Sequence, residues 1–136
     1  MPHSIKLNDA LGVIVLRSAG NVDFTELRND LDELVRLPGF REGLALVADF
    51  RGSSTPVTAA EIGKLADYAK RTDAKWGVTK WAFIAADDLT FGLTRMFMAM
   101  TEDYDVTTQV FRDDIRADGW LGLGADVEEI LKQTPD

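Results

Sequence analysis

A short apolar run from Leu44 to Phe50, interrupted only by Asp49, constrains the fold more than any other part of the chain. An apolar run of roughly four to eight residues is typical of a strand covered on both faces. A segment rich in Gly, Ser, Thr and Pro follows at residues 51–58, and a helical pattern begins after it. In open α/β sheets, ligands bind outside the carboxyl ends of such strands. We therefore expect residues 49–58 to form a loop that serves as a functional surface.

Two strands and a helix are expected before this run. Ser4–Asn8 and Gly12–Arg17 have the composition of strands, and the residues between them favour a tight turn. Asp23 is a good N-cap residue, and Glu26 follows it at the spacing of a capping box. Apolar residues then recur at helical spacing, so the first helix should run to about Arg36.

Helices and strands continue to alternate after the run. Thr58 and Glu61 form a second capping box at the start of the next helix. Trp76, which follows that helix, is expected to be buried against the end of the sheet. The remaining predicted elements are a strand at Thr79–Ala86, a helix capped by Asp87 and Asp88, a strand at Val106–Phe111, a helix capped by Asp113 and Asp114, and a terminal turn or helix that includes Val127.

This alternation predicts an α/β fold, because strand-helix-strand units form parallel sheets through right-handed crossovers. We expect a mostly parallel sheet of about five strands with helices packed on it, and an N-terminal strand added antiparallel. Residues 1–136 should form a single domain, with its core at about residues 4–123 and a C-terminal helical extension at 124–133.

The charge of the chain excludes several classes of partner. The net charge is −8 and the pI is near 4.6, so nucleic acid and anionic membrane surfaces are both repelled. No apolar run approaches the roughly 18 residues of a membrane span. Residues 1–6 lack the charged-then-apolar pattern of a secretory signal. We therefore expect a cytoplasmic protein with no nucleic-acid partner and no membrane insertion.

The sequence contains few of the side chains that enzymes most often use for catalysis, which argues against an enzyme. The sequence has no cysteine, and its one histidine, His3, falls in a segment that we expect to be frayed. The residues most used for proton transfer near neutral pH are therefore missing. We expect no catalytic residue, no metal site and no cofactor. An alternative is an enzyme that uses Asp49 with Asp87 or Asp88, since carboxylates that follow neighbouring strands are able to share a magnesium ion.

Several motifs together resemble one superfamily. They are the Asp23-capped helix, the strand ending Val47-Ala48-Asp49-Phe50, the strand from Lys80 to Ala85, and a closing pattern of Val110-Phe111-Arg112-Asp113 followed by Ala117 and Trp120-Leu121. With this order of elements, the chain resembles the STAS superfamily, in its SpoIIAA-like branch, which is also described as STAS/SEC14-like. The similarity covers about residues 4–123.

The resemblance implies a non-enzymatic regulatory or ligand-binding module. In anti-sigma-factor antagonists of this kind, a serine at the start of the helix after the central strand is phosphorylated and switches partner binding. The corresponding segment here offers Ser53, Ser54 and Thr55, and the resemblance points to Ser53 and Ser54 as phosphorylation sites. The helix itself begins Thr58-Ala59-Ala60-Glu61, in place of the family's Asp-Ser-x-Gly pattern. The SEC14-like side of the relationship implies an apolar or lipid-like ligand.

The third predicted helix carries apolar residues on more than one side. Its expected sheet-facing stripe consists of Leu89, Leu93, Met96, Phe97 and Met100. Phe91 and Met98, with Arg95 between them, lie off that stripe. They form either a dimer face or the lip of an apolar pocket, unless the C-terminal segment covers them.

These observations lead to a first interpretation and two alternatives. The first is a module that binds a protein partner or a second copy of itself. Its contact residues are Asp49, Arg51, Ser53, Ser54, Thr55, Phe91, Arg95 and Met98. The second is a carrier or sensor of a small apolar ligand, held between the third helix and the sheet. The third is the enzyme that uses Asp49.

Overall fold

The computed structural model of the chain describes residues 3–113, 115–124 and 127–133, and the strands of this part form one five-stranded sheet. The strands are β1 (Ser4–Asn8), β2 (Val13–Asn21), β3 (Ala45–Ser54), β4 (Thr79–Ile84) and β5 (Val106–Phe111). Their order in the sheet is the order of the sequence. β1 pairs antiparallel with β2, and all other pairs are parallel, which confirms the predicted fold class.

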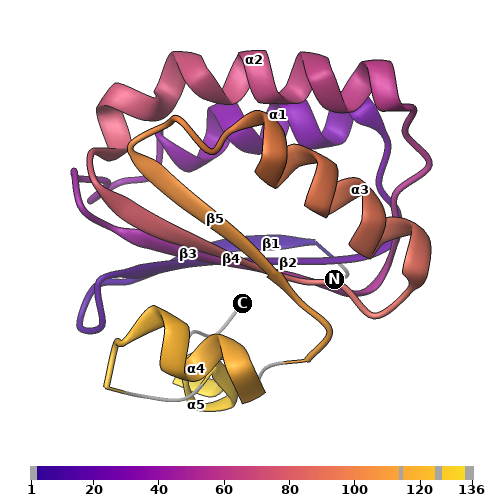
Figure 1. Cartoon of the computed structure of the whole chain (residues 1–136). Helices are drawn as coiled ribbons and strands as arrows, with labels where there is room; N and C mark the ends of the chain where they lie inside the picture. The colour runs from indigo at the N-terminus through magenta and orange to yellow at the C-terminus, as the bar shows by residue number, and fades with distance from the viewer. Residues whose placement is uncertain (1–2, 114, 125–126, 134–136) are drawn as a thin grey trace.

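The helices divide between the two faces of the sheet (Figure 1). α1 (Phe24–Leu34), α2 (Ala59–Trp76) and α3 (Asp88–Met100) cover one face. α4 (Ile115–Leu121) and α5 (Val127–Gln133) cover the other. Each parallel strand is added on the same side of its predecessor, so three right-handed crossovers place α1, α2 and α3 on the same face.

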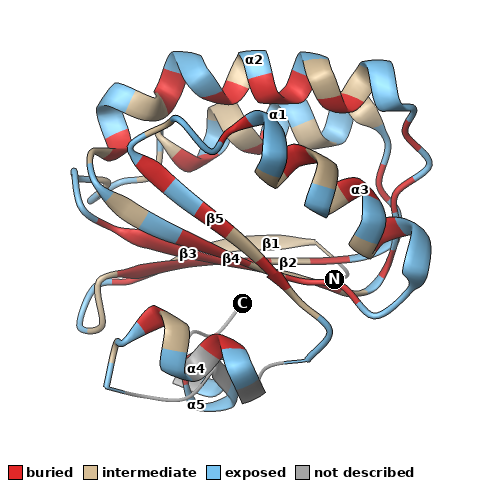
Figure 2. Cartoon of the chain, viewed as in Figure 1, coloured by how far each residue is buried: buried red, intermediate tan, exposed pale blue. Residues whose placement is uncertain are grey.

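Each face of the sheet contributes its own apolar core. Leu16, Leu46 and Phe50 pack under α1–α3, while Val15, Val47 and Ile84 pack under α4 and α5. Successive side chains of a strand point to opposite faces of the sheet, and the first four residues of β2 and of β3 are all buried (Figure 2). The continuous apolar run of β3 is thus the pattern of a strand that has helices on both sides.

The predicted helix starts are present with their capping hydrogen bonds. The Asp23 side chain accepts from the Glu26 N–H at 2.9 Å. Thr58 and Glu61 form the reciprocal capping box, at 2.9 and 3.1 Å. Asp87 accepts from the Thr90 N–H at 2.7 Å and caps α3. These caps satisfy N–H groups that have no partner within the helix.

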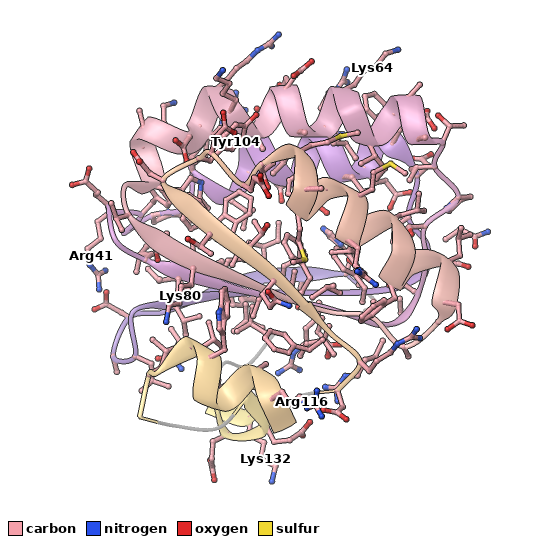
Figure 3. The ribbon with its side chains drawn as sticks, viewed as in Figure 1. Arg41, Lys64, Lys80, Tyr104, Arg116 and Lys132 are labelled. Atoms are coloured by element: carbon pink, nitrogen blue, oxygen red, sulfur yellow. The ribbon has the colours of Figure 1, made fainter. Side chains whose placement is uncertain are left out.

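Trp76 is fully buried, as predicted, although it is the last residue of α2 and not part of a loop. Its ring meets those of Phe40 and Trp81 edge-on, with both centroid distances at 5.0 Å. The Tyr104 hydroxyl, labelled in Figure 3, donates to the Ala66 carbonyl at 2.9 Å and joins the approach to β5 to α2. On the other face, Lys80 donates to the Trp120 carbonyl at 2.7 Å and joins β4 to α4.

β2 and β3 are both longer than predicted. The residues after Phe50 were expected to form a loop, yet β3 runs to Ser54 and β2 runs to Asn21. A register shift between Arg17 and Ala19 allows pairing to resume, with Ala19 opposite Gly52. A Cβ atom on Gly52 would lie 3.4 Å from the Ala19 Cβ, at ordinary van der Waals contact. Local composition favoured a turn, and pairing with β2 overrides it.

No helix in the described ranges is both long enough and apolar enough to cross a membrane.

Candidate functional site

An apolar cavity lies between the sheet and the three helices of its α1–α3 face. Its volume is about 90 Å³, which is well above the roughly 10–15 Å³ that one water needs and approaches the roughly 150 Å³ of a cavity known to hold benzene. The sheet forms its floor, and α1, α2 and α3 contribute the rest of its wall. The lining residues are Leu16, Leu27, Asp30, Leu31, Leu34, Leu46, Phe50, Thr55, Val57, Ile62, Leu65, Trp81, Phe83, Thr90, Leu93, Thr94 and Phe97.

Most of the polar lining atoms already have partners within the protein. Thr55 and Thr90 share a hydrogen bond between their hydroxyls at 3.1 Å, and Thr90 also donates to Asp87 Oδ2 at 3.0 Å. The Thr94 hydroxyl donates to the Thr90 carbonyl at 2.7 Å. These threonines therefore line the cavity without unmet hydrogen bonds, and it remains an apolar space.

Asp30 is the one charged residue in the lining, and it is only 5% exposed. Its Oδ1 lies 3.1 Å from His3 Nε2, while His3 Nδ1 lies 3.3 Å from the Ser18 hydroxyl. Within the described part of the chain, Asp30 Oδ2 is buried and has no hydrogen-bond partner. A buried carboxylate oxygen without a donor is costly, so this atom is expected to accept a donor from a bound molecule or water.

The surroundings of Asp30 disfavour its charged form. The pKa of Asp30 is raised to about 6, chiefly by burial and also by the neighbouring carboxylates of Glu33 and Glu26, while His3 acts in the opposite direction. A carboxyl group with a pKa this close to neutrality responds to small changes in its environment. Asp30 is thus the chemically distinctive group of the cavity.

Trp81 adds a second unmatched polar atom to the cavity wall. In the part of the chain that the structure covers, its indole Nε1 is buried and makes no hydrogen bond. Asp30 offers an acceptor when ionised, and Trp81 offers a donor. An occupant with complementary groups would satisfy both.

His3, Asp30 and Glu33 also form a cluster in which one ligand atom from each residue lies within 4.8 Å of the others. One imidazole nitrogen and two carboxylate oxygens suit Zn²⁺ or another divalent cation. In this structure, however, His3 and Asp30 contact each other, and Glu33 is exposed. The arrangement therefore serves first to hold the Asp30 carboxylate.

Sequence reasoning missed this group for two reasons. His3 was expected in a frayed segment, but it packs against β2 and α1 through Ser18 and Asp30. Asp30 carried a readable signal, because it shares a helical face with Leu27, Leu31 and Leu34. A charged residue inside an apolar stripe marks either a buried pair or a site.

Asp49 and Arg51, two of the predicted contact residues, lie on the opposite face of the sheet and contact each other. The Arg51 N–H donates to Asp49 Oδ1 at 3.1 Å, and its guanidinium donates to both Asp49 oxygens at 3.0 and 3.1 Å. This guanidinium also reaches Glu128 Oε1 at 3.3 Å. These hydrogen bonds, with that to Asp49 first, raise the pKa of Arg51. Asp49 lines a shallow polar recess with Arg17, Glu128 and Lys132.

The structure does not assemble the acidic pair that an enzyme built on Asp49 requires. Asp87 caps α3 and bonds Thr90, on the α1–α3 side of the sheet. Asp88 pairs with Arg112 at 2.8 Å. The Asp49 carboxylate forms an ion pair with Arg51 on the α4–α5 side of the sheet. Each of the three carboxylates thus has a structural partner of its own, and joint action of Asp49 with Asp87 or Asp88 stays a prediction.

The three hydroxyl residues after Arg51 differ sharply in accessibility. Ser53 is 6% exposed within β3, and Thr55 is buried against Thr90. Phosphorylation of Ser53 stays a prediction, and it would require β3 to open locally because the side chain is buried. Ser54 is exposed, and its phosphorylation stays a prediction.

α3 is rotated relative to the stripe that its apolar residues predicted. Thr90, Leu93 and Phe97 face inward, whereas Leu89 and Met100 are 59% and 43% exposed. The hydroxyls of Thr90 and Thr101 find partners inside the protein, which makes their burial favourable. On the flank predicted as a contact face, Phe91 lies 4.1 Å beneath the Arg112 guanidinium, Met98 is half-buried and Arg95 is exposed.

Comparison with known proteins bears on the fold. No family model matches the chain, and no curated protein matches it. A crystal structure of an uncharacterized DUF3478-family protein with a SpoIIAA-like fold, from Shewanella loihica PV-4, is similar to it. The sequences are 13% identical, the TM-score is 0.52, and the similarity covers 88% of this chain and 91% of that one. The predicted resemblance is confirmed at the level of architecture: this chain has a SpoIIAA-like α/β fold.

Proposed function

We propose that this protein is a binding module that holds a small apolar molecule in the cavity between the sheet and α1–α3. The cavity itself carries this proposal. Its wall is formed by residues from three helices and three strands, and it is apolar apart from Asp30, the three threonines and the Trp81 nitrogen. Concave pockets with an apolar lining and few polar groups are the usual form of small-molecule sites. The SpoIIAA-like fold, which is generally non-enzymatic, supports a binding role.

The energetics favour an occupant over an empty space. An unfilled cavity costs about 24 cal/mol per Å³, so a volume of about 90 Å³ corresponds to about 2 kcal/mol of lost stability. A ligand that fills this space recovers dispersion contacts with its wall. Ligand binding should therefore raise the melting temperature.

The test compares one variant that fills the cavity with one that does not. Leu31→Phe adds bulk at the wall, while Leu89→Phe makes the same change at an exposed position. Benzene and n-hexanol serve as probes, followed by thermal unfolding and by NMR. We expect both probes to raise the melting temperature of the wild type and of Leu89→Phe, with a much smaller effect on Leu31→Phe. An unchanged wild-type melting temperature and spectrum with both probes would refute the proposal.

A protein partner or a second copy is a separate candidate function, supported by the surface of α3. Leu89 and Met100 are exposed at opposite ends of one stripe of this helix, with Met96 half-buried between them. Exposed apolar residues in one row are typical of contact surfaces. Phe91 and Met98, the residues first predicted for this role, are less accessible.

Light scattering over a range of concentrations tests this second candidate. If a dimer uses the α3 stripe, Leu89→Glu should shift it to monomer without changing the melting temperature. Thr25→Glu, on the exposed side of α1, introduces the same charge elsewhere and should leave the dimer intact. A wild-type protein that is monomeric at every concentration contradicts self-association.

A further inference from the structure

We infer that the cavity selects a molecule with one protonated amine on a small apolar body, and that Asp30 Oδ2 binds the amine. This inference rests on the proposed function, because it assigns a chemical class to the ligand of the same cavity. It starts from Asp30, which lines the cavity, and from its buried Oδ2, which has no partner among the described residues.

The position of the Asp30 carboxylate is fixed by its neighbours. His3 Nε2 contacts Oδ1 at 3.1 Å, and Ser18 contacts the other ring nitrogen of His3 at 3.3 Å. This arrangement occupies one carboxylate oxygen and leaves the second for a donor. A donor group supplied from within the cavity would complete the hydrogen bonding of the carboxylate.

The charges around Asp30 favour a cation over a neutral or anionic group. The groups that act on it are the carboxylates of Glu26 and Glu33 from α1, and His3 from the start of β1. With Asp30 itself, three carboxylates face one imidazole, so the local field is negative. An ammonium group is attracted to such a field and forms a charge-assisted hydrogen bond with the carboxylate. Fatty acids and phosphate-bearing lipids would instead place a negative charge beside Asp30.

The volume of the cavity limits the apolar part of the ligand. About 90 Å³ accommodates a body of a few carbon atoms, on the scale of a small ring or a short alkyl chain. Such a body would contact apolar side chains such as Leu31, Leu93 and Phe97. The unmatched Trp81 Nε1 provides a donor for an additional oxygen on the ligand.

The experiment compares three probes that share one chain length: n-hexylamine, n-hexanol and hexanoate. Binding is measured by NMR titration and calorimetry at about pH 7.5, where the amine is protonated. EDTA is included so that no cation held by His3, Asp30 and Glu33 competes. We expect the wild type to bind the amine at least about tenfold more tightly than the alcohol, and to bind hexanoate most weakly. In Asp30→Asn this preference for the amine should disappear while binding of the alcohol is retained.

Lowering the pH provides a second test that needs no variant. Protonation of Asp30 at about pH 5 should weaken amine binding by about tenfold relative to pH 7.5, because a group with a pKa of about 6 is then mostly neutral. Binding of the alcohol should stay nearly constant. This comparison decides the matter if Asp30→Asn does not fold.

The possible failures are distinguishable. Equal binding of amine and alcohol by the wild type, unchanged between the two pH values, would overturn the amine inference and leave an apolar binding site. Tighter binding of hexanoate would overturn it as well. If none of the three probes binds, and benzene also fails to bind, the proposed function itself is refuted.

Discussion

The pH dependence of folding stability is expected to change when Asp30 is replaced by Asn. In the folded protein, the pKa of Asp30 is raised from 3.8 to about 6, mainly by burial. Below about pH 3 the group is protonated in both the folded and the unfolded state, so it does not affect the free energy of unfolding. Although the folded protein ionises Asp30 above about pH 6, it keeps the proton between about pH 4 and pH 6, where the unfolded chain ionises. The free energy of unfolding therefore falls across this range.

The size of this effect follows from the two pKa values. One pKa unit corresponds to 1.36 kcal/mol, so the full loss is about 3 kcal/mol, of which about 2 kcal/mol falls between pH 4 and pH 7. Asn does not titrate, and its side-chain oxygen is still able to accept from His3. The stability of Asp30→Asn relative to the wild type should therefore improve by about 2 kcal/mol from pH 4 to pH 7.

Urea unfolding at several pH values, followed by tryptophan fluorescence and circular dichroism, measures this difference. Glu102→Gln removes an exposed carboxylate and should show no comparable change. If the stability difference between Asp30→Asn and the wild type is the same at pH 4 and pH 7, Asp30 does not ionise at a cost in the folded state. The reasoning on this group would then be refuted.

Three further predictions concern positions outside the cavity and are all measured by chemical denaturation. Thr58→Ala removes the capping box of α2 and should lower the free energy of unfolding by about 1 kcal/mol. Thr25→Ala, at an exposed site, should lower it by under about 0.5 kcal/mol. Equal losses would contradict the role of the cap. Trp76→Ala should lower the free energy of unfolding by about 3–5 kcal/mol because the indole is fully buried. Val78→Ala, at a position 82% exposed, should have little effect. A small loss for Trp76→Ala would show that the contacts of its indole are dispensable. Arg51→Met leaves the half-buried Asp49 carboxylate without its partner and should lower the free energy of unfolding by about 1–3 kcal/mol. An unchanged stability would show that water replaces the guanidinium as the hydrogen-bond donor.

Local features were predictable from the sequence because their causes lie within a few residues. The caps at Asp23, Thr58 and Asp87 each involve a side chain and an N–H group three residues later. The order of strands and helices follows from alternating apolar segments, and right-handed crossovers then determine the face that α1–α3 cover. The fold could therefore be predicted without knowing which distant residues contact each other.

The candidate site was not predictable, because it depends on contacts between distant residues. His3 and Asp30 meet only when β1 and α1 are placed beside each other, and neither residue has a local motif. The length of β3 was underestimated because Gly52 and Ser53 favour turns in isolation, while pairing with β2 is worth more. The face of α3 was misjudged because apolar residues alone were considered, although Thr90 and Thr101 are buried through hydrogen bonds.

The division of helices between the two faces has a consequence for synthesis on the ribosome. The sheet and α1–α3 are complete once β5 has emerged, but α4 and α5 come last in the chain. Until they emerge, Val13, Val15, Val47 and Ile84 remain uncovered on one face of a nearly finished sheet. The nascent chain thus passes through a stage in which the α1–α3 face is complete and the other face of the sheet exposes an apolar surface. At that stage the chain is a natural target for chaperones, and premature termination after Phe111 should yield a protein that aggregates.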